Sequence, residues 1–406
     1  MKNYRRLILG RNLIRFIVAG VLIVLAFRFF FVPFKIYTLQ KRPFMVRVRL
    51  LHDADDTRLG GGLKCNISDA RTGGLLARNI PVHEGTQVVP FKGIIKIGSR
   101  IFDSEEVRVS PSRGGDLVLG GTAYRGELFI ANTGEGLDVI NKLELEDYLK
   151  GVVPREMNYL WPVAALKAQA IASRSFVLYE ALRRRNKDYD ITADTFSQVY
   201  GGVSGERWRA TRAVEATKGK VLEYEGEVLP AYFHSCCGGH TENIARIWGE
   251  NFGASGIDME PLKGVRCGSC RWSPHFRWQI RIAAKTIAQK LKEKDYPIDG
   301  INEIREGERD DSGRLECVRV RSGDKWFEIP AEEFRAVTGR KYLRSANFRI
   351  KKYPFFYFFS GYGWGHGVGM CQWGAFGLSV RRKSAERILS YYYPGARIVN
   401  MWEVIG

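Results

Sequence analysis

The sequence predicts an α+β fold, with a β-rich N-terminal part, a helical segment and an inserted α/β subdomain around one cleft, preceded by a single transmembrane helix. Three observations predict it. Residues 44–140 show short alternating or β-branched runs separated by turn compositions. Helical spacing begins near Lys142, and residues 276–350 mix a helix with strands. With 406 residues, 45% of them hydrophobic and 26% charged, the chain can bury a sizeable core in two or three compact units.

A basic tail and an apolar run begin the sequence. Residues 1–12 are predicted to be a basic cytoplasmic tail and residues 13–34, apolar at 19 of 22 positions, a transmembrane anchor. As a helix this run would span roughly 33 Å, enough for the hydrocarbon core of a bilayer. Lys and Arg before the run keep the N-terminus in the cytoplasm, so we expect the main domain on the periplasmic or cell-wall side of the cytoplasmic membrane. A cleaved signal peptide and a buried core helix are the alternatives.

The positive charge is concentrated at the same end. The net charge is +19, and residues 1–49 hold eleven of the 63 Lys and Arg but no Asp or Glu. Most of the charge excess therefore flanks the predicted anchor, and nucleic acid is not an expected partner. A metallo-hydrolase is also disfavoured, because the sequence contains no HExxH-type helix.

Residues 44–140 are the predicted β-rich N-terminal part. FMVRVRLL, QVVPF, GIIKIG, EEVRVS and LDVI alternate in polarity or are β-branched, which is typical of strands. DADD, TGG, SRGG and NTGEG between such runs have turn compositions. No crossover helix interrupts them, so a β-rich region is expected.

Residues 141–275 are predicted to form a helical core. LELEDYLKGVV has helical spacing and is stopped by Pro154, and a Trp-Pro pair then opens a long helix that ends in three Arg. Glu156 falls in the short link between these two helices. A helix near Trp208–Thr217 and a hairpin that runs into His234 follow.

Two further segments complete the predicted organisation. Residues 276–350 are expected to be the inserted α/β subdomain, with a helix over Ala283–Glu293. Residues 351–406 are expected to complete the core with a Gly-rich loop and a helix from about Ala385 to Tyr393. The glycines of that loop would let the backbone approach a ligand closely.

Four ordered motifs stand out in the sequence: INKLELEDYLKGVVPREM (140–157), QAIASRSF with DTFSQVYGG (169–202), FHSCCGGHTEN (233–243) and SGYGWGHGVGMCQWGA (360–375). Together they resemble the SpoIID/LytB family, the stage II sporulation protein D type of peptidoglycan lytic transglycosylase. The resemblance implies cleavage of the MurNAc–GlcNAc bond of cell-wall glycan strands, giving 1,6-anhydro-MurNAc ends, with Glu156 of the 141–275 core as general acid and base. The alternative is a non-catalytic glycan-binding enhancer of a cell-wall amidase. Expected partners are peptidoglycan strands, the membrane through the N-terminal helix and, under the alternative, an amidase.

The surroundings of Glu156 suit a carboxyl group that must be protonated near neutral pH. Its apolar neighbours are Pro154, Met157, Tyr159, Leu160 and Trp161. An apolar wall raises the pKa of a carboxyl group by disfavouring the ionised form. One such group suffices for the implied reaction, whereas ordinary glycosidases use two. The alternative is that Glu156 caps the N-terminus of the next helix, where acidic residues are favoured.

The resemblance also implies residues that bind the glycan around Glu156. These are Gln169, Arg174, Ser175, Gln198, Tyr200, His366 and Gln372. Core packing is the alternative for the three on the long helix, and a structural cleft wall is favoured for the Gly-rich loop. Cys371 departs from the family, which usually has Ser there. A small core residue explains Cys371 better than a Cys–His nucleophilic pair with His366.

A cluster of soft ligands indicates a metal site or disulfides. HSCCGGH (234–240) and CGSC (267–270) place two His and four Cys within 37 residues. The spacing suits a closed structural zinc site made of Cys237, His240, Cys267 and Cys270, with His234 and Cys236 as alternates. One or two disulfides, or free thiols, are the alternatives. No cofactor is expected for catalysis.

Overall fold

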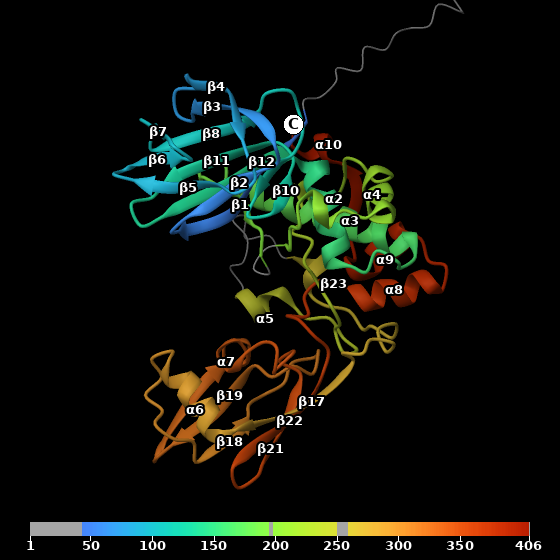
Figure 1. Cartoon of the computed structure of the whole chain (residues 1–406). Coiled ribbons are helices and arrows are strands. Elements are labelled where there is room, and N and C mark those ends of the chain that lie inside the picture. Colours follow the sequence, from blue (N-terminus) through green and yellow to red (C-terminus); the bar gives the residue numbers. More distant parts are fainter. Residues whose placement is uncertain (1–42, 195–197, 250–258, 406) are drawn as a thin grey trace, which may run out of the picture. The chain divides into compact units, whose positions relative to one another are not determined.

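The structure is a computed structural model that describes residues 43–194, 198–249 and 259–405 (Figure 1). From Phe44 onward the described chain forms one compact unit. Strands and helices are both present and largely segregated, which confirms the α+β class and the β-rich N-terminal part.

Two antiparallel sheets make up the β-rich part. The first has the order β13-β1-β12-β11-β8-β3-β4, with only the β1–β13 pair parallel. Its strands are β1 (Met45–Ala54), β3 (Leu63–Asp69), β4 (Leu75–Val82), β8 (Glu106–Pro111), β11 (Glu127–Asn132), β12 (Leu137–Glu144) and β13 (Ile191–Thr192). The second has the order β10-β9-β2-β5-β6-β7. Its strands are β2 (Thr57–Gly60), β5 (Thr86–Phe91), β6 (Ile94–Ile97), β7 (Arg100–Phe102), β9 (Leu117–Leu119) and β10 (Thr122–Tyr124).

One hydrophobic core joins these two sheets. Alternate residues of β8 and β11 are buried, as the period of two along a strand requires. Val107 and Ile130 of the first sheet belong to the same buried cluster as Val88 and Leu119 of the second. The alternation read from the sequence therefore corresponds to a real inward face.

Helix α3 (Val163–Arg183) is the centre of the helical core. Fifteen of its 21 residues are buried, so it is covered on nearly all sides. It packs against α2 (Leu145–Glu156), α4 (Trp208–Glu215), α8 (Gln372–Val380) and α9 (Ala385–Tyr392), as Figure 1 shows. Its Ala-rich sequence allows these helices to approach closely, because Ala has a small side chain and high helix propensity.

Short strands attach the remaining segments to this core. β14 (Lys220–Tyr224) pairs with β15 (Glu227–Val228) and with β24 (Arg397–Asn400), which precedes α10 (Met401–Val404). β16 (Phe233–His234) pairs in parallel with β23 (Met370–Cys371). Three short helices, η1 (Val203–Gly205), α5 (Ile244–Trp248) and η2 (Glu260–Leu262), lie in the connecting loops.

The inserted segment has a hydrophobic core of its own. Its two three-stranded sheets are ordered β17-β22-β21 and β18-β19-β20. Its elements are β17 (Arg277–Ala283), α6 (Ala284–Lys292), β18 (Glu303–Glu306), β19 (Cys317–Ser322), β20 (Lys325–Pro330), α7 (Ala331–Thr338), β21 (Phe348–Lys352) and β22 (Phe356–Tyr362). The predicted helix over Ala283–Glu293 is confirmed as α6. Tyr357 and Phe359 of β22 belong to this core, so the folded insert extends beyond residue 350.

The first helix of the core ends later than predicted. The sequence predicts that this helix stops at Pro154, but α2 continues through Pro154 and ends at Glu156. A proline near the last turn costs one backbone hydrogen bond and still permits helical φ. Glu156 is therefore the last residue of α2 rather than part of a free link.

The membrane-spanning part of the predicted fold class is not supported. None of the helices in residues 43–194, 198–249 and 259–405 combines the length and the apolar run needed to cross a bilayer. The longest of them, α3, is too charged, since it carries Lys167, Arg174 and Glu180. The predicted anchor at residues 13–34 lies outside the described residues, as does the predicted tail at 1–12.

Candidate active site and cysteine cluster

A cavity of about 490 Å³ lies where the end of α2 meets α3, β16 and the Gly-rich loop. Its described lining residues are Glu156, Phe176, Val199, Tyr232, Phe233, His234, Ser235, Trp248, Trp364, Gly365, His366 and Gln372. Glu156 is the only carboxyl group among them. The other walls are mainly aromatic, so the acid faces an apolar space.

Glu156 is held by two neighbours. The backbone N–H of Val199 donates to Glu156 Oε1 at 2.7 Å, and the side chain of Gln372 also hydrogen-bonds to the carboxyl group. Burial raises the pKa of Glu156 above its ordinary value, and these two hydrogen bonds lower it by less. A buried carboxyl with a raised pKa can hold a proton closer to neutral pH than an exposed one.

Three predicted residues form a polar network behind the acid. Gln372 Nε2 donates to Gln169 Oε1 at 3.3 Å, and Gln169 Nε2 donates to Ser173 Oγ at 3.1 Å. Gln198 reaches the same turn of α3 through its Nε2, which donates to Ser173 O at 3.4 Å. Of these three residues only Gln372 lines the cavity, and Gln169 and Gln198 contact Gln372 or helix α3 instead. Residues 195–197 of the DTFSQVYGG motif lie outside the described residues.

Arg174, Ser175 and Tyr200 lie away from the cavity lining. Arg174 is fully buried and makes a two-point ion pair with Glu146 of α2, at 2.9 and 2.8 Å. Ser175 Oγ accepts from the backbone N–H of Leu222 in β14 at 2.7 Å. Tyr200 is 7% exposed, and its hydroxyl donates to Asn141 Oδ1 at 3.3 Å. Their contacts are those of core residues, as the packing alternative for Arg174 and Ser175 expected.

Two histidines line the cavity in defined tautomers. His366 Nε2 donates to Phe233 O at 3.0 Å, while its Nδ1 accepts from the N–H of Val368 at 3.1 Å. His234 Nδ1 donates to Val368 O at 3.1 Å, and its buried Nε2 has no hydrogen-bond partner among the described residues. Burial lowers the pKa of both, that of His366 to about 4, so both rings are neutral.

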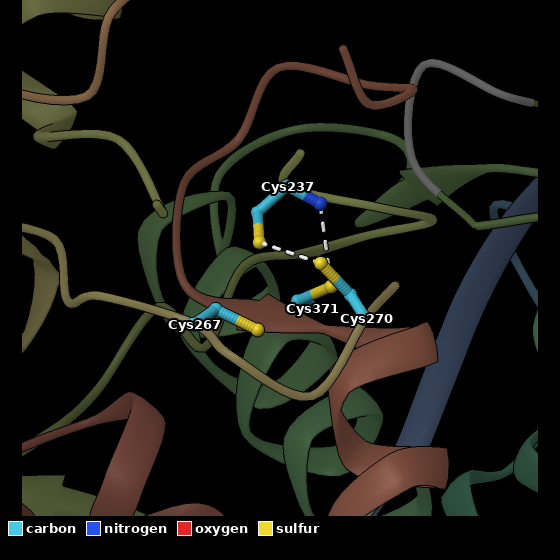
Figure 2. A group of neighbouring side chains, drawn as sticks. All are labelled: Cys237, Cys267, Cys270 and Cys371. Atoms are coloured by element: carbon cyan, nitrogen blue, oxygen red, sulfur yellow. Dashed lines mark hydrogen bonds between the residues drawn. The ribbon is translucent and has the colours of Figure 1, made fainter. Parts of the chain in front are cut away.

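The contacts of the two His366 ring nitrogens exclude a nucleophilic pair of Cys371 with His366. Both nitrogens of His366 are occupied by the backbone, and Cys371 is fully buried. Cys371 instead joins Cys237, Cys267 and Cys270, whose sulfur atoms all lie within 4.8 Å of one another (Figure 2). The predicted zinc ligand His240 is not in this group, and its Nδ1 contacts Thr241 O at 2.6 Å.

Sequence reasoning missed the aromatic walls of the cavity. Tyr232 and Trp248 stack with ring centroids 4.7 Å apart, and Trp248 and Trp364 remain 40% and 36% exposed. Exposed Trp is a recognisable signal only once the fold places it beside a cavity. The sequence offers nine Trp without indicating which of them meet Glu156.

Fold and site together define an α+β protein with one buried acid in an aromatic-lined cavity. The sequence also matches two models of known protein families. The family model described as stage II sporulation protein (SpoIID) matches residues 133–224, which include Glu156. A second model, a domain of unknown function (DUF8618), matches residues 268–369, which cover the inserted segment.

The chain belongs to the SpoIID family. It is 30% identical to a stage II sporulation protein D of Bacillus amyloliquefaciens over 64% of this chain and 75% of that protein. It is 34% identical to an uncharacterized protein of Brachyspira hyodysenteriae, over 70% of this chain and 74% of that protein. An amidase enhancer of Bacillus subtilis is 28% identical over 62% of this chain and 40% of its own length. These relationships assign the chain a role connected with the bacterial cell wall.

Proposed function

We propose that this protein is a peptidoglycan lytic transglycosylase that uses Glu156 as its general acid and base. The observation that carries the proposal is the buried carboxyl of Glu156, with a raised pKa, at the wall of an aromatic-lined cavity. On this proposal the chain acts outside the cytoplasm, where its glycan substrate lies.

The reaction needs one carboxyl group used twice. The protonated Glu156 gives its proton to the oxygen between MurNAc and GlcNAc, and the bond from that oxygen to MurNAc C1 breaks. The resulting carboxylate then takes the proton of the MurNAc 6-hydroxyl, whose oxygen bonds to C1 and closes the 1,6-anhydro ring. Glu156 ends protonated and no water is consumed. Ordinary glycosidases need a second carboxyl, and the described cavity lining holds none.

The residues that line the cavity offer the contacts that bind the glycan. Trp248 and Trp364 line the cavity and are partly exposed, so they offer apolar ring surface to sugar rings. The Ser235 side chain, which lines the cavity, offers hydrogen bonds to sugar hydroxyl or acetamido groups. Gln372 holds the carboxyl in place from the opposite chain segment.

Product analysis tests the proposal directly. The purified full chain is incubated with peptidoglycan, and the fragments are identified by mass spectrometry, with intact and amidase-treated glycan compared. We expect MurNAc ends that are lighter than hydrolysed ends by one water. Hydrolysed ends, or no cleavage of either glycan, would refute the transglycosylase.

A relative named amidase enhancer motivates the second function, that of a glycan-binding protein that stimulates a separate amidase. The two functions are separated by adding a cell-wall amidase to the same assay. Release of stem peptides that rises with this protein, in the absence of any anhydro products, would favour the enhancer. Anhydro products without amidase would favour the enzyme.

The pH dependence of glycan cleavage is expected to follow Glu156. Because the reaction starts from the protonated acid, activity should fall as pH rises through the raised pKa of Glu156. The folded state also binds this proton more tightly than the unfolded state does. The free energy of unfolding contributed by Glu156 should therefore decrease as pH rises from the ordinary to the raised pKa. Rate profiles and thermal unfolding at a series of pH values measure both effects, and a rate that rises across this interval would contradict the assignment.

A further inference from the structure

We propose that Cys237, Cys267, Cys270 and Cys371 form a closed structural zinc site. Their four sulfur atoms lie within 4.8 Å of one another, and those of Cys237 and Cys270 are 3.5 Å apart (Figure 2). A tetrahedral zinc ion with Zn–S bonds of about 2.3 Å places its sulfur ligands about 3.8 Å apart. The observed cluster is therefore already close to the size of a four-thiolate zinc site.

The cysteines come from three segments that meet only in the folded chain. Cys237 follows β16, Cys267 and Cys270 lie in one loop, and Cys371 ends β23 at the start of α8. The parallel pairing of β16 with β23 brings Cys371 to Cys237. All four residues are buried, with exposures of 3% or less, so the site would have no open position for water or substrate. A closed four-ligand site is structural rather than catalytic.

Hydrogen-bond donors surround the sulfur atoms. Cys371 Sγ accepts from the N–H groups of Cys237 at 3.2 Å and of Gly374 at 3.3 Å. Cys237 Sγ accepts from the N–H of Gly239 at 3.4 Å, and Cys267 Sγ lies 3.1 Å from the hydroxyl of Tyr392. Four thiolates around one Zn²⁺ carry a net charge of −2, and such donors around the ligands stabilise that charge.

The backbone of α8 is shaped to approach the cluster. A Cβ at Gly374 would strike the Tyr392 hydroxyl and lie 2.9 Å from Cys267 Sγ, so only glycine lets the first turn of α8 come this close. Buried Arg314 donates to Cys237 O at 2.9 Å and to His240 O at 3.1 Å, and so holds the loop that carries Cys237. The surroundings are therefore ordered around the sulfur atoms from several sides.

The site would support the cavity without taking part in the reaction. Ser235 is two residues from Cys237, and Gln372 follows Cys371 directly, and both line the cavity with Glu156. A metal that joins these two segments fixes the side of the cavity from which Gln372 reaches the acid. This inference stands whether or not glycan cleavage is the activity, because its tests measure the metal.

Metal analysis of the purified full chain tests the proposal. Elemental analysis should find close to one zinc per chain. After denaturation with a chelator and without reductant, all seven cysteines should react as thiols. A protein without zinc would overturn the proposal, and two thiols fewer per bridge would identify disulfides in its place. Iron at the site would also overturn it, since four thiolates bind either metal.

Two matched variants locate the ligands. Cys371→Ser should lose its zinc to a chelator that the wild-type protein resists, and its Tm should fall. Cys236→Ser tests the alternate ligand: Cys236 is equally buried and its thiol contacts those of Cys270 and Cys371, but it lies outside the group of four, so this variant should keep its zinc. Cys65→Ser is the control, because Cys65 is equally buried but belongs to the core of the β-rich part. His240→Ala should also keep the metal. Zinc retained by Cys371→Ser, or lost by His240→Ala, would overturn the ligand set.

Cobalt substitution provides a readout in folded protein. Co²⁺ in place of zinc should give the visible absorption of a tetrahedral four-sulfur site in wild-type protein and in Cys236→Ser. Cys371→Ser should change that spectrum if it remains folded. An octahedral spectrum in the wild-type protein would overturn the proposal.

Discussion

Glu156→Gln is expected to lower the rate of anhydro-product release by about 10²- to 10⁴-fold, the range that a positioned general acid and base contributes. Glutamine has the shape of glutamate and can still accept from the N–H of Val199, which lies 2.7 Å from Oε1. It cannot donate the proton that the glycosidic oxygen requires, nor take one from the 6-hydroxyl. The rate is measured by chromatography of released fragments, at substrate concentrations that separate kcat from KM. The loss should lie in kcat, because glycan binding relies mainly on the walls.

Stability distinguishes this loss from misfolding. Burying the ionised carboxyl is unfavourable, so Glu156→Gln should unfold at the same temperature as wild type or slightly higher. Glu144→Gln is the matched control, since Glu144 precedes the same helix at its other end, is exposed and makes no side-chain capping bond. It should keep full activity. A Glu156→Gln protein that releases as much anhydro product as wild type would refute the mechanism.

Arg174→Met is expected to lower the free energy of unfolding by about 3–5 kcal/mol, the typical cost of removing one partner of a buried ion pair. Arg174 is 0% exposed and Glu146 16%, and the pair joins α3 to α2 at 2.8 Å. The same guanidinium donates to Lys220 O at 3.0 Å, and Glu146 also accepts from the N–H of Gly219 at 3.1 Å. Its removal would leave the partly buried Glu146 carboxylate without its cationic partner and the Lys220 carbonyl without this donor. Urea unfolding monitored by circular dichroism measures the change.

A double variant and a surface control sharpen this prediction. Arg174→Met combined with Glu146→Gln should recover part of the loss, because no charge is then left unpaired. Arg183→Met lies on the same helix, but Arg183 is 42% exposed and 3.8 Å from Glu180, so it should change stability by less than about 0.5 kcal/mol. An Arg174→Met protein with wild-type stability and strongly weakened glycan binding would show that Arg174 contacts substrate instead.

Local patterns predicted most of the fold. The alternation over 44–140, the Ala-rich run that became α3 and the helix that became α6 were recognisable because their hydrophobic periods match one secondary structure each. The end of α2 was misplaced, since a proline in the last turn removes only one hydrogen bond. The transmembrane helix was inferred from an apolar run at 13–34, and no helix of the described chain supports it.

The site was predictable where its residues lie close together in the sequence. Glu156 stands out because its neighbours from Pro154 to Trp161 are mostly apolar. Its place in an apolar cavity and its raised pKa agree with that local setting. Arg174 and Ser175 share a helix with Gln169, and spacing alone could not tell which face of α3 meets the cavity and which meets α2 and β14. Because α3 is buried on nearly every side, its hydrophobic pattern does not distinguish one face from another.

By itself the sequence determined the α+β class, the acid in its apolar setting and an excess of cysteine near His234. Tertiary structure alone decided which sulfur atoms meet. Cys371 lies 134 residues from Cys237, yet its Sγ accepts from the Cys237 N–H, because β16 and β23 pair in parallel. His240, three residues from Cys237, turns instead to Thr241 O. Spacing along the chain constrains only near neighbours, whereas a ligand set depends on distances that the pairing of remote strands fixes.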